Sequence, residues 1–196
     1  DVYKRQPSWC LNMMTAKKLN FGNIMGHVTN VTNLSSLASW TADQFDPTIT
    51  WEDIAWIKDR WKGKLILKGI MDSEDAMLAV KAGADAIIIS NHGGRQLDGA
   101  PSTISVLPEI VDAVNSKVEV HFDGGVRSGQ DVLKALALGA DCIHIGRPYV
   151  YGLGAKGQEG VEIAIEIIKK ELDLTMAMCG ETVSYTHLRA HETVED

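Results

Sequence analysis

Four short apolar runs lie in the middle of the chain, and polar, glycine-containing sequence follows each of them. Because the runs are rich in β-branched residues, they predict strands, at Leu65–Lys68, Ala86–Ser90, Val118–Phe122 and Cys142–Gly146. Helical periodicity predicts helices between and around the strands, near residues 52–61, 73–82, 103–114, 129–138 and 157–172. Short apolar strands that alternate with helices are typical of an α/β fold whose parallel sheet is buried on both sides.

An internal repeat supports this alternation of helix and strand. Residues 75–85 read DAMLAVKAGAD and residues 131–141 read DVLKALALGAD, an offset of 56 residues. Each copy predicts an amphipathic helix, then a glycine (Gly83 or Gly139) where the helix should end, then an apolar strand. Units of about 28 residues suit a β/α barrel. A doubly wound sheet is the alternative that four parallel strands leave open.

The length limits how much of a barrel the chain can form. It has 196 residues, whereas a closed eight-stranded barrel usually needs about 250. Residues 7–50 lack a clear period and are interpreted as a long loop that leads to the first helix. The Trp, Met and Lys cluster at residues 9–18 is interpreted as packing against the barrel. Contact with a membrane surface or a partner subunit is the alternative.

Composition and charge exclude several classes of protein. The chain is 45% hydrophobic and 23% charged, as an ordinary globular domain is. A net charge of −7 argues against nucleic-acid binding. No run of about 18 apolar residues occurs, so no membrane span is expected. The cysteines, Cys10, Cys142 and Cys179, form no C-x-x-C pair, which predicts a reducing compartment and an inert thiol at Cys142.

Both ends of the chain differ in character from the rest. Residues 1–6 (DVYKRQ) show no usable pattern, and the sequence becomes abruptly polar from Ser184. We interpret residues 1–6 and 184–196 as a non-native leader and tail, with the domain between them at residues 7–183. His187 and His191 have a spacing that metal-binding helices use, but in such a tail they are not expected to form a metal site.

Unusual residues follow all four predicted strands, at the end of a parallel sheet where chemistry gathers. The third and fourth predicted strands are each followed by a loop in which arginine comes shortly after glycine. Glycine lets a backbone N–H approach a ligand closely, the next helix offers its positive end, and arginine adds bidentate donors. These loops predict a phosphate site, the alternative being tight turns with solvated arginines. Its residues are Gly124, Gly125, Arg127, Gly146 and Arg147.

Lys68, His92 and Arg95 add candidate catalytic chemistry. Lys68 ends the first strand, where its ammonium could stabilise negative charge on a bound ring. His92 and Arg95 lie three residues apart in a glycine-bearing loop. An imidazole can act as a base near neutral pH, and a guanidinium can hold a carboxylate through two hydrogen bonds. The pair therefore suits a small carboxylic acid that loses a proton. The other histidines before the tail, His27, His121 and His144, are interpreted as packing residues.

The run SNHGGRQLDG at residues 90–99 resembles the signature of the FMN-dependent α-hydroxy-acid dehydrogenases and oxidases. The similarity extends through LILKGI (65–70), DGGVRSGQDVLKALALGAD (123–141) and IGRP (145–148). It implies the C-terminal half of a TIM (β/α)8 barrel, strands five to eight with their helices. It also implies FMN as cofactor and oxidation of an (S)-2-hydroxy acid to a 2-oxo acid.

The resemblance assigns a role to each candidate residue. Lys68 and Ser90 would contact the flavin ring, and His92 would be the active-site base. Arg95 would hold the substrate carboxylate, with His92 also in contact with the substrate. The remaining residues would hold the rest of the FMN: Asp123 the ribityl chain, Gly124, Gly125 and Arg127 the phosphate region, and Gly146 and Arg147 the phosphate.

The resemblance also implies what the chain lacks and where the parent protein works. The family's first four strands would precede Pro7, so we expect this chain to be inactive alone. The parent is expected to be a homotetramer in the cytoplasm, with peripheral contact to the inner face of the cell membrane left open. Two alternatives remain: another FMN- or phosphate-binding barrel enzyme, or a non-catalytic half-barrel that assembles with copies of itself.

Overall fold

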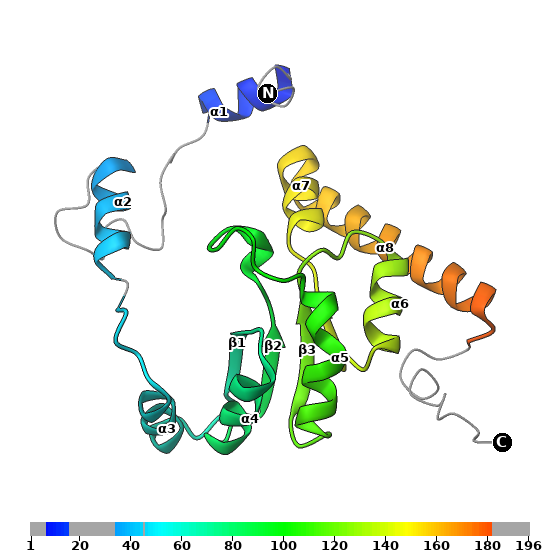
Figure 1. Ribbon diagram of the computed structural model, residues 1–196. Helices are drawn as coiled ribbons and strands as arrows, with labels where there is room; N and C mark the ends of the chain where they lie inside the picture. The colour runs from blue at the N-terminus through cyan, green and yellow to red at the C-terminus, as the bar shows by residue number, and fades with distance from the viewer. Residues whose placement is uncertain (1–6, 16–33, 45, 182–196) are drawn as a thin grey trace. The chain divides into compact units, whose positions relative to one another are not determined.

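The computed structural model describes residues 7–15, 34–44 and 46–181. The chain forms two compact units, Asp1–Ile49 and Thr50–Asp196. The described part of the first unit contains two short helices, α1 (Pro7–Thr15) and α2 (Leu34–Asp43), shown in blue in Figure 1. The expectation of a long loop over residues 7–50 is therefore wrong for the segments that form α1 and α2. Residues 16–33, which include His27, Lys17 and Lys18, lie outside the described residues, as do residues 1–6 and 182–196.

α1 and α2 both contain threonine, a residue that is unfavourable in helices. Threonine disfavours helices partly because its hydroxyl competes for backbone partners. In α1 the Thr15 hydroxyl donates to the carbonyl of Leu11 at 2.8 Å, and in α2 the Thr41 hydroxyl donates to that of Leu37 at 2.8 Å. Each hydroxyl thus finds its partner one turn back within its own helix, so the helix is kept.

The second unit alternates strands and helices (Figure 1). Its elements are α3 (Trp51–Arg60), β1 (Ile66–Ile70), α4 (Ser73–Lys81), β2 (Ala86–Ile89), the 3-10 helix η2 (His92–Gly94), α5 (Thr103–Val114), β3 (Glu119–Asp123), α6 (Gly129–Ala137), β4 (Cys142–His144), α7 (Arg147–Lys156) and α8 (Gln158–Cys179). The strands form a parallel sheet in the order β1-β2-β3-β4. The four predicted strands and five predicted helices are confirmed, with shifted ends in all but α5, and α7 was not predicted.

Helices cover one face of this sheet. Ile87, Ile89, Val120 and Phe122 belong to the core cluster together with apolar side chains of α4, α5, α6 and α8. Alternate residues of the same strands point to the other face. There Ile66 is 46% exposed. The prediction that the sheet is buried on both sides is therefore confirmed for the helix-covered face and only in part for the other face, where Ala86 and His121 are buried.

The internal repeat has a structural cause in the aspartate that ends each copy. The backbone N–H of Asp85 donates to the carbonyl of Leu65, and its carboxylate accepts from the Leu65 N–H at 2.9 Å. Asp141 is bonded in the same way, to the carbonyl and N–H of Val120. Each aspartate therefore ties the start of its own strand to the preceding strand, which fixes the register of the parallel pair.

The last two helices pack closely through a pair of glycines. A Cβ placed on Gly152 of α7 or Gly160 of α8 would collide with the backbone of the other glycine. Only glycine allows this approach, so α7 depends on its contact with α8. α8 runs further than the predicted 157–172, to Cys179. Within the described ranges, the helices lack the combination of length and apolar character that crossing a membrane requires.

Candidate functional site

The loops after the four strands meet around one cavity of about 530 Å³. Parallel strands bring their carboxyl ends to the same edge of the sheet, which is why residues far apart in sequence converge there. All the predicted site residues except Ser90 line this cavity: Lys68, His92, Arg95, Asp123, Gly124, Gly125, Arg127, Gly146 and Arg147. The structure thus brings the predicted residues together, while their roles remain predictions.

Lys68 of β1 is held in place by one residue just after β2 and one at the end of β3. Its ammonium lies 2.8 Å from a carboxylate oxygen of Asp123 and donates to the Ser90 hydroxyl at 2.6 Å. The same hydroxyl accepts the backbone N–H of His92 at 3.2 Å. Ser90 is buried and therefore acts behind the cavity wall, where it links the lysine to the start of the histidine loop.

The loop that carries His92 has an unusual backbone. His92, Gly93 and Gly94 have φ angles of 56°, 66° and 70°. A left-handed conformation suits glycine but costs a histidine free energy, and such strain gathers at functional sites. The side chain of Asn91 accepts the Gly93 N–H at 3.1 Å, and Arg147 donates to the Gly93 carbonyl at 2.8 Å. These two contacts hold the loop so that His92 faces the cavity.

The two glycines after β3 are required for different reasons. Gly124 has φ 109°, and a Cβ there would lie 2.8 Å from the Thr103 hydroxyl oxygen, which donates to the Gly124 carbonyl. Gly125 has φ 82° and open space around it. Gly124 is thus packed from behind, whereas Gly125 leaves its backbone accessible from the cavity.

The amino end of α6 differs from the expectation. Asp131 accepts the backbone N–H groups of Arg127 at 2.9 Å and Ser128 at 3.1 Å. Desolvation works against the charged form of Asp131, but these hydrogen bonds outweigh it and lower the pKa of the carboxyl. Within α6 itself, the N–H of Gly129 donates to the Glu171 carboxylate and that of Asp131 to the Ser128 hydroxyl, so these donors are used within the chain. Donors for an anion are left to the backbone at Gly125, the arginine side chains and the start of α7.

The charges around the cavity suit an anionic ligand. Lys68, Arg95, Arg127 and Arg147 line it together with one carboxylate, that of Asp123. This excess of positive charge lies in a chain whose net charge is −7. A ligand that carries a phosphate would match the arginines and the accessible glycine backbone, since arginine binds phosphate through two donors. The residues present therefore fit the phosphate and polar chain of FMN.

Three further side chains of the cavity that can form hydrogen bonds were not predicted as site residues. His144, Tyr149 and Tyr151 line it, the tyrosines on α7. His144, interpreted from the sequence as a packing residue, lines the cavity, and its Nε2 lies 3.1 Å from the Nδ1 of His121. Burial lowers the pKa of His144, the charges of His121 and Lys68 act in the same direction, and Asp123 opposes them. The polar alternation H-x-D in β3 and C-x-H in β4 is the signal that could have located this cluster.

Comparisons with known proteins agree with this geometry. The family model for FMN-dependent dehydrogenases matches residues 2–191. The L-lactate dehydrogenases of Vibrio parahaemolyticus and Pseudomonas syringae are each 46% identical to this chain, over 90% of its length and 47% of theirs. The crystal structure of mandelate oxidase with (S)-4-hydroxymandelic acid matches with a TM-score of 0.71 and 46% identity, over 77% of this chain and 42% of that one.

The chain spans about half the length of the relatives it matches. Its four strands and their helices correspond to about half of the TIM barrel of these FMN enzymes, which decides against the doubly wound alternative. The matched range includes parts of both end stretches, and the interpretation of those stretches as non-native stays a prediction. The match over nearly the whole chain shows that it belongs to the family of FMN-dependent dehydrogenases.

Proposed function

We propose that this chain forms the part of an FMN-dependent enzyme that binds the cofactor and the substrate carboxylate. The whole protein would oxidise an (S)-2-hydroxy acid to the 2-oxo acid. The observation that carries the proposal is the convergence of Lys68, His92, Arg95, Arg127 and Arg147 on one cavity. Relatives that are named lactate dehydrogenase and mandelate oxidase support a 2-hydroxy acid as the substrate class.

Arg127, Arg147 and the backbone at Gly125 would hold the FMN phosphate. Asp123 would accept a hydrogen bond from the ribityl chain. The Lys68 ammonium, fixed by Asp123 and Ser90, would face the flavin ring and stabilise negative charge there. FMN would supply the acceptor for the two electrons that leave the substrate.

His92 and Arg95 would act on the substrate itself. The Arg95 guanidinium would pair with the carboxylate through two N–H groups, which fixes the position of the α-carbon. Oxidation of the carbinol breaks one C–H and one O–H bond. The imidazole of His92 would accept one of these two hydrogens as a proton, whichever bond breaks first, and bound FMN would supply the acceptor for the second hydrogen and the electron pair. The strained backbone at His92 would keep the imidazole in place for this transfer.

FMN titration of the whole chain, followed by quenching of flavin fluorescence, tests this proposal. We expect saturable binding. Loss of a charge-assisted hydrogen bond costs about 1.5 to 3 kcal/mol, so Arg127→Ala and Arg147→Ala should each weaken binding about tenfold to a hundredfold. Arg95→Ala should leave FMN affinity nearly unchanged, because that arginine is assigned to the substrate.

Arg60→Ala is the matched control for the loss of an arginine. Arg60 stacks on Trp56 in α3 and does not line the cavity. Circular dichroism would confirm that each variant is folded. An absence of saturable binding by a folded chain, or equal weakening by Arg60→Ala, would count against the proposed cofactor site.

A further inference from the structure

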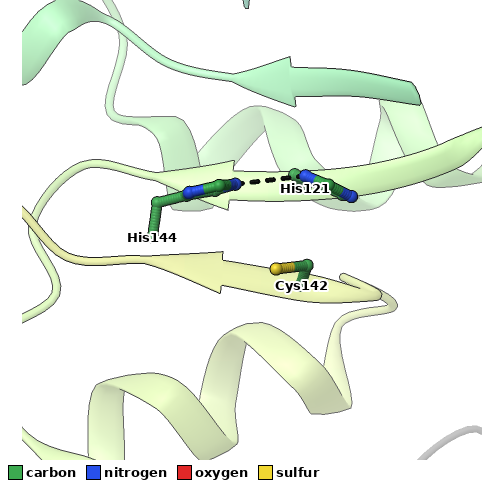
Figure 2. Close-up of side chains that lie close together, drawn as sticks. All are labelled: His121, Cys142 and His144. Carbon is green, nitrogen blue, oxygen red and sulfur yellow. Dashed lines mark hydrogen bonds between the residues drawn. The ribbon is translucent and has the colours of Figure 1, made fainter. Parts of the chain in front are cut away.

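A second group of ligating side chains lies on the face of the sheet that the helices do not cover, here called the open face. The Nδ1 of His121 is 3.1 Å from the Nε2 of His144. One ring nitrogen of each histidine and the Sγ of Cys142 all lie within 4.8 Å of one another. Figure 2 shows the two imidazoles end to end, His121 from β3 and His144 from β4, with the sulfur of Cys142 also on β4. We propose that His121, Cys142 and His144 bind a divalent transition-metal ion of the Zn²⁺ type.

The strand register produces this cluster. His121 of β3 and Cys142 of β4 are partners across the parallel pair, and His144 lies two residues further along β4. Residues two apart in a strand point to the same face, and neighbouring strands are about 4.8 Å apart. Three ligand atoms therefore converge without any loop. Two strands hold them rigidly, as a preorganised metal site requires.

The kind of donor selects the kind of ion. One thiolate and two imidazoles suit Zn²⁺ and its late first-row neighbours, whereas Mg²⁺ and Ca²⁺ prefer oxygen donors. With bonds of about 2.0 to 2.3 Å, tetrahedral zinc ligands lie about 3.3 to 3.8 Å from one another. The two histidine nitrogens, 3.1 Å apart, are close to that range, and all three ligand atoms lie within 4.8 Å of one another, so we expect small rotations of the side chains to suffice. Three protein ligands leave the fourth position open to water.

Glu119 orients one of the ligands. Its carboxylate oxygen lies 3.2 Å from the Nε2 of His121. A carboxylate only accepts, so the tautomer of His121 that carries its proton on Nε2 donates it to Glu119 and presents the Nδ1 lone pair toward the cluster. Metal ligands commonly have such a carboxylate partner behind them. On metal binding, the proton of His144 moves from Nε2 to Nδ1 and Cys142 releases its proton to solvent.

The site is distinct from the contacts proposed for FMN. His121 is 8% exposed, while Cys142 and His144 are half-buried. His144 also lines the cavity described above. A bound ion would join β3 to β4, whose pairing extends over only three residue pairs. Metal binding can be measured without FMN, so its failure is distinguishable from failure of the proposed function.

Titration of the whole chain with Co²⁺, in a reducing buffer free of thiols, tests the proposal. We expect absorption bands of tetrahedral Co²⁺ together with a thiolate-to-cobalt charge-transfer band, and stoichiometric displacement by Zn²⁺. Cys142→Ser should abolish the charge-transfer band, and His144→Asn should weaken binding. Circular dichroism would show that both variants remain folded.

Two matched controls separate this cluster from other donors of the chain. The double variants Cys10→Ser/Cys179→Ser and His187→Ala/His191→Ala should leave the Co²⁺ spectrum unchanged. X-ray absorption of the zinc-loaded, unmodified chain gives a readout that needs no variant. It should show one sulfur at about 2.3 Å and nitrogen at about 2.0 to 2.1 Å. A missing charge-transfer band, a band that persists in Cys142→Ser, or two or more sulfurs would overturn the proposal.

Glu119 is a positioning residue in this proposal and has its own test. Because its side chain is 72% exposed, we expect Glu119→Ala to weaken Zn²⁺ binding about tenfold, the small end of such effects. Glu119→Gln keeps a carbonyl oxygen for the His121 N–H and should restore most of the affinity. Equal affinity in wild type and Glu119→Ala would overturn the assignment of Glu119.

Discussion

The two faces of the sheet differ in character although the same four strands form both. On the helix-covered face, Ile87 and Ile89 are fully buried and the side chains are aliphatic or aromatic. On the open face the same strands present Lys68, His121 and Asp123. In β3 the two kinds simply alternate. The period of two therefore assigns stability to one face and chemistry to the other, and single substitutions can test each face separately.

The largest expected difference lies between buried and open isoleucines. Ile87→Ala should lower the free energy of unfolding by about 2 to 5 kcal/mol, since it removes a fully buried side chain and leaves a cavity. Ile66→Ala, on the open face where the side chain is 46% exposed, should cost below about 1 kcal/mol. Urea unfolding followed by circular dichroism measures both. Equal losses would show that another part of the protein covers the open face.

The next largest effect concerns the turn at the end of β3. Gly124→Ala should lower the free energy of unfolding by about 1 to 3 kcal/mol, because φ 109° strains an alanine and its Cβ meets Thr103. Gly154→Ala is the matched control, since it lies within α7 with open space around it. That change should be neutral or stabilising by up to about 1 kcal/mol. Thermal unfolding of both variants would decide, and a stable Gly124→Ala would contradict the description of the turn.

Removal of the Lys68 charge on the open face should affect FMN binding more than it affects the stability of the fold. Lys68→Met should weaken FMN binding about tenfold to a hundredfold, since a hydrogen bond to a charged group contributes about 1.5 to 3 kcal/mol. Its effect on the free energy of unfolding should stay within about 1 kcal/mol, because the pair with Asp123 is partly exposed. Lys117→Met, outside the cavity, should change neither value. Fluorescence titration and urea unfolding give the two readouts, and a loss confined to stability would remove Lys68 from the site.

The smallest expected effect is a change in the pH dependence of stability, caused by Asp85 at the opposite end of the strands from the cavity. Hydrogen bonds from Lys58 and Lys64, and from the Leu65 N–H, lower the pKa of Asp85 below its ordinary 3.8. Because the folded-state pKa is lowered, the stabilisation is complete above that ordinary value and is lost as pH falls below it. Asp85→Asn should therefore flatten the pH dependence of stability in acid. Urea unfolding at a series of pH values measures the slope, and an unchanged slope would contradict this account.

The central elements could be predicted because local and global signals agree there. α5 begins and ends at the predicted residues, and its buried positions, Leu107, Ile110 and Val114, have helical spacing. The repeat located α4, α6 and their following strands. Gly83 and Gly139 have positive φ just after these helices, as their positions predicted. In these elements the pattern of burial alone determines the local structure.

Other elements could not be predicted, because their stability comes from contacts that no local pattern shows. α7 reads RPYVYGLGAK, without an apolar stripe, and it exists because Gly152 lets it pack against Gly160 of α8. β4 ends at His144 rather than at Gly146. At the site, the motif at residues 90–99 located His92 and Arg95. Tyr149, Tyr151 and His144 could be placed at the cavity only from the tertiary structure.

The sequence by itself determined the order of strands and helices, the family and the residues at the strand ends. Those features depend on apolar periodicity and on short motifs that lie within a few residues of one another. Only the tertiary structure decided that Lys68 pairs with Asp123, that Arg147 reaches Gly93, and that His121, Cys142 and His144 form a cluster. The register of neighbouring strands sets these contacts. Register depends on backbone hydrogen bonds between segments far apart in the chain, such as those of Asp85 and Asp141.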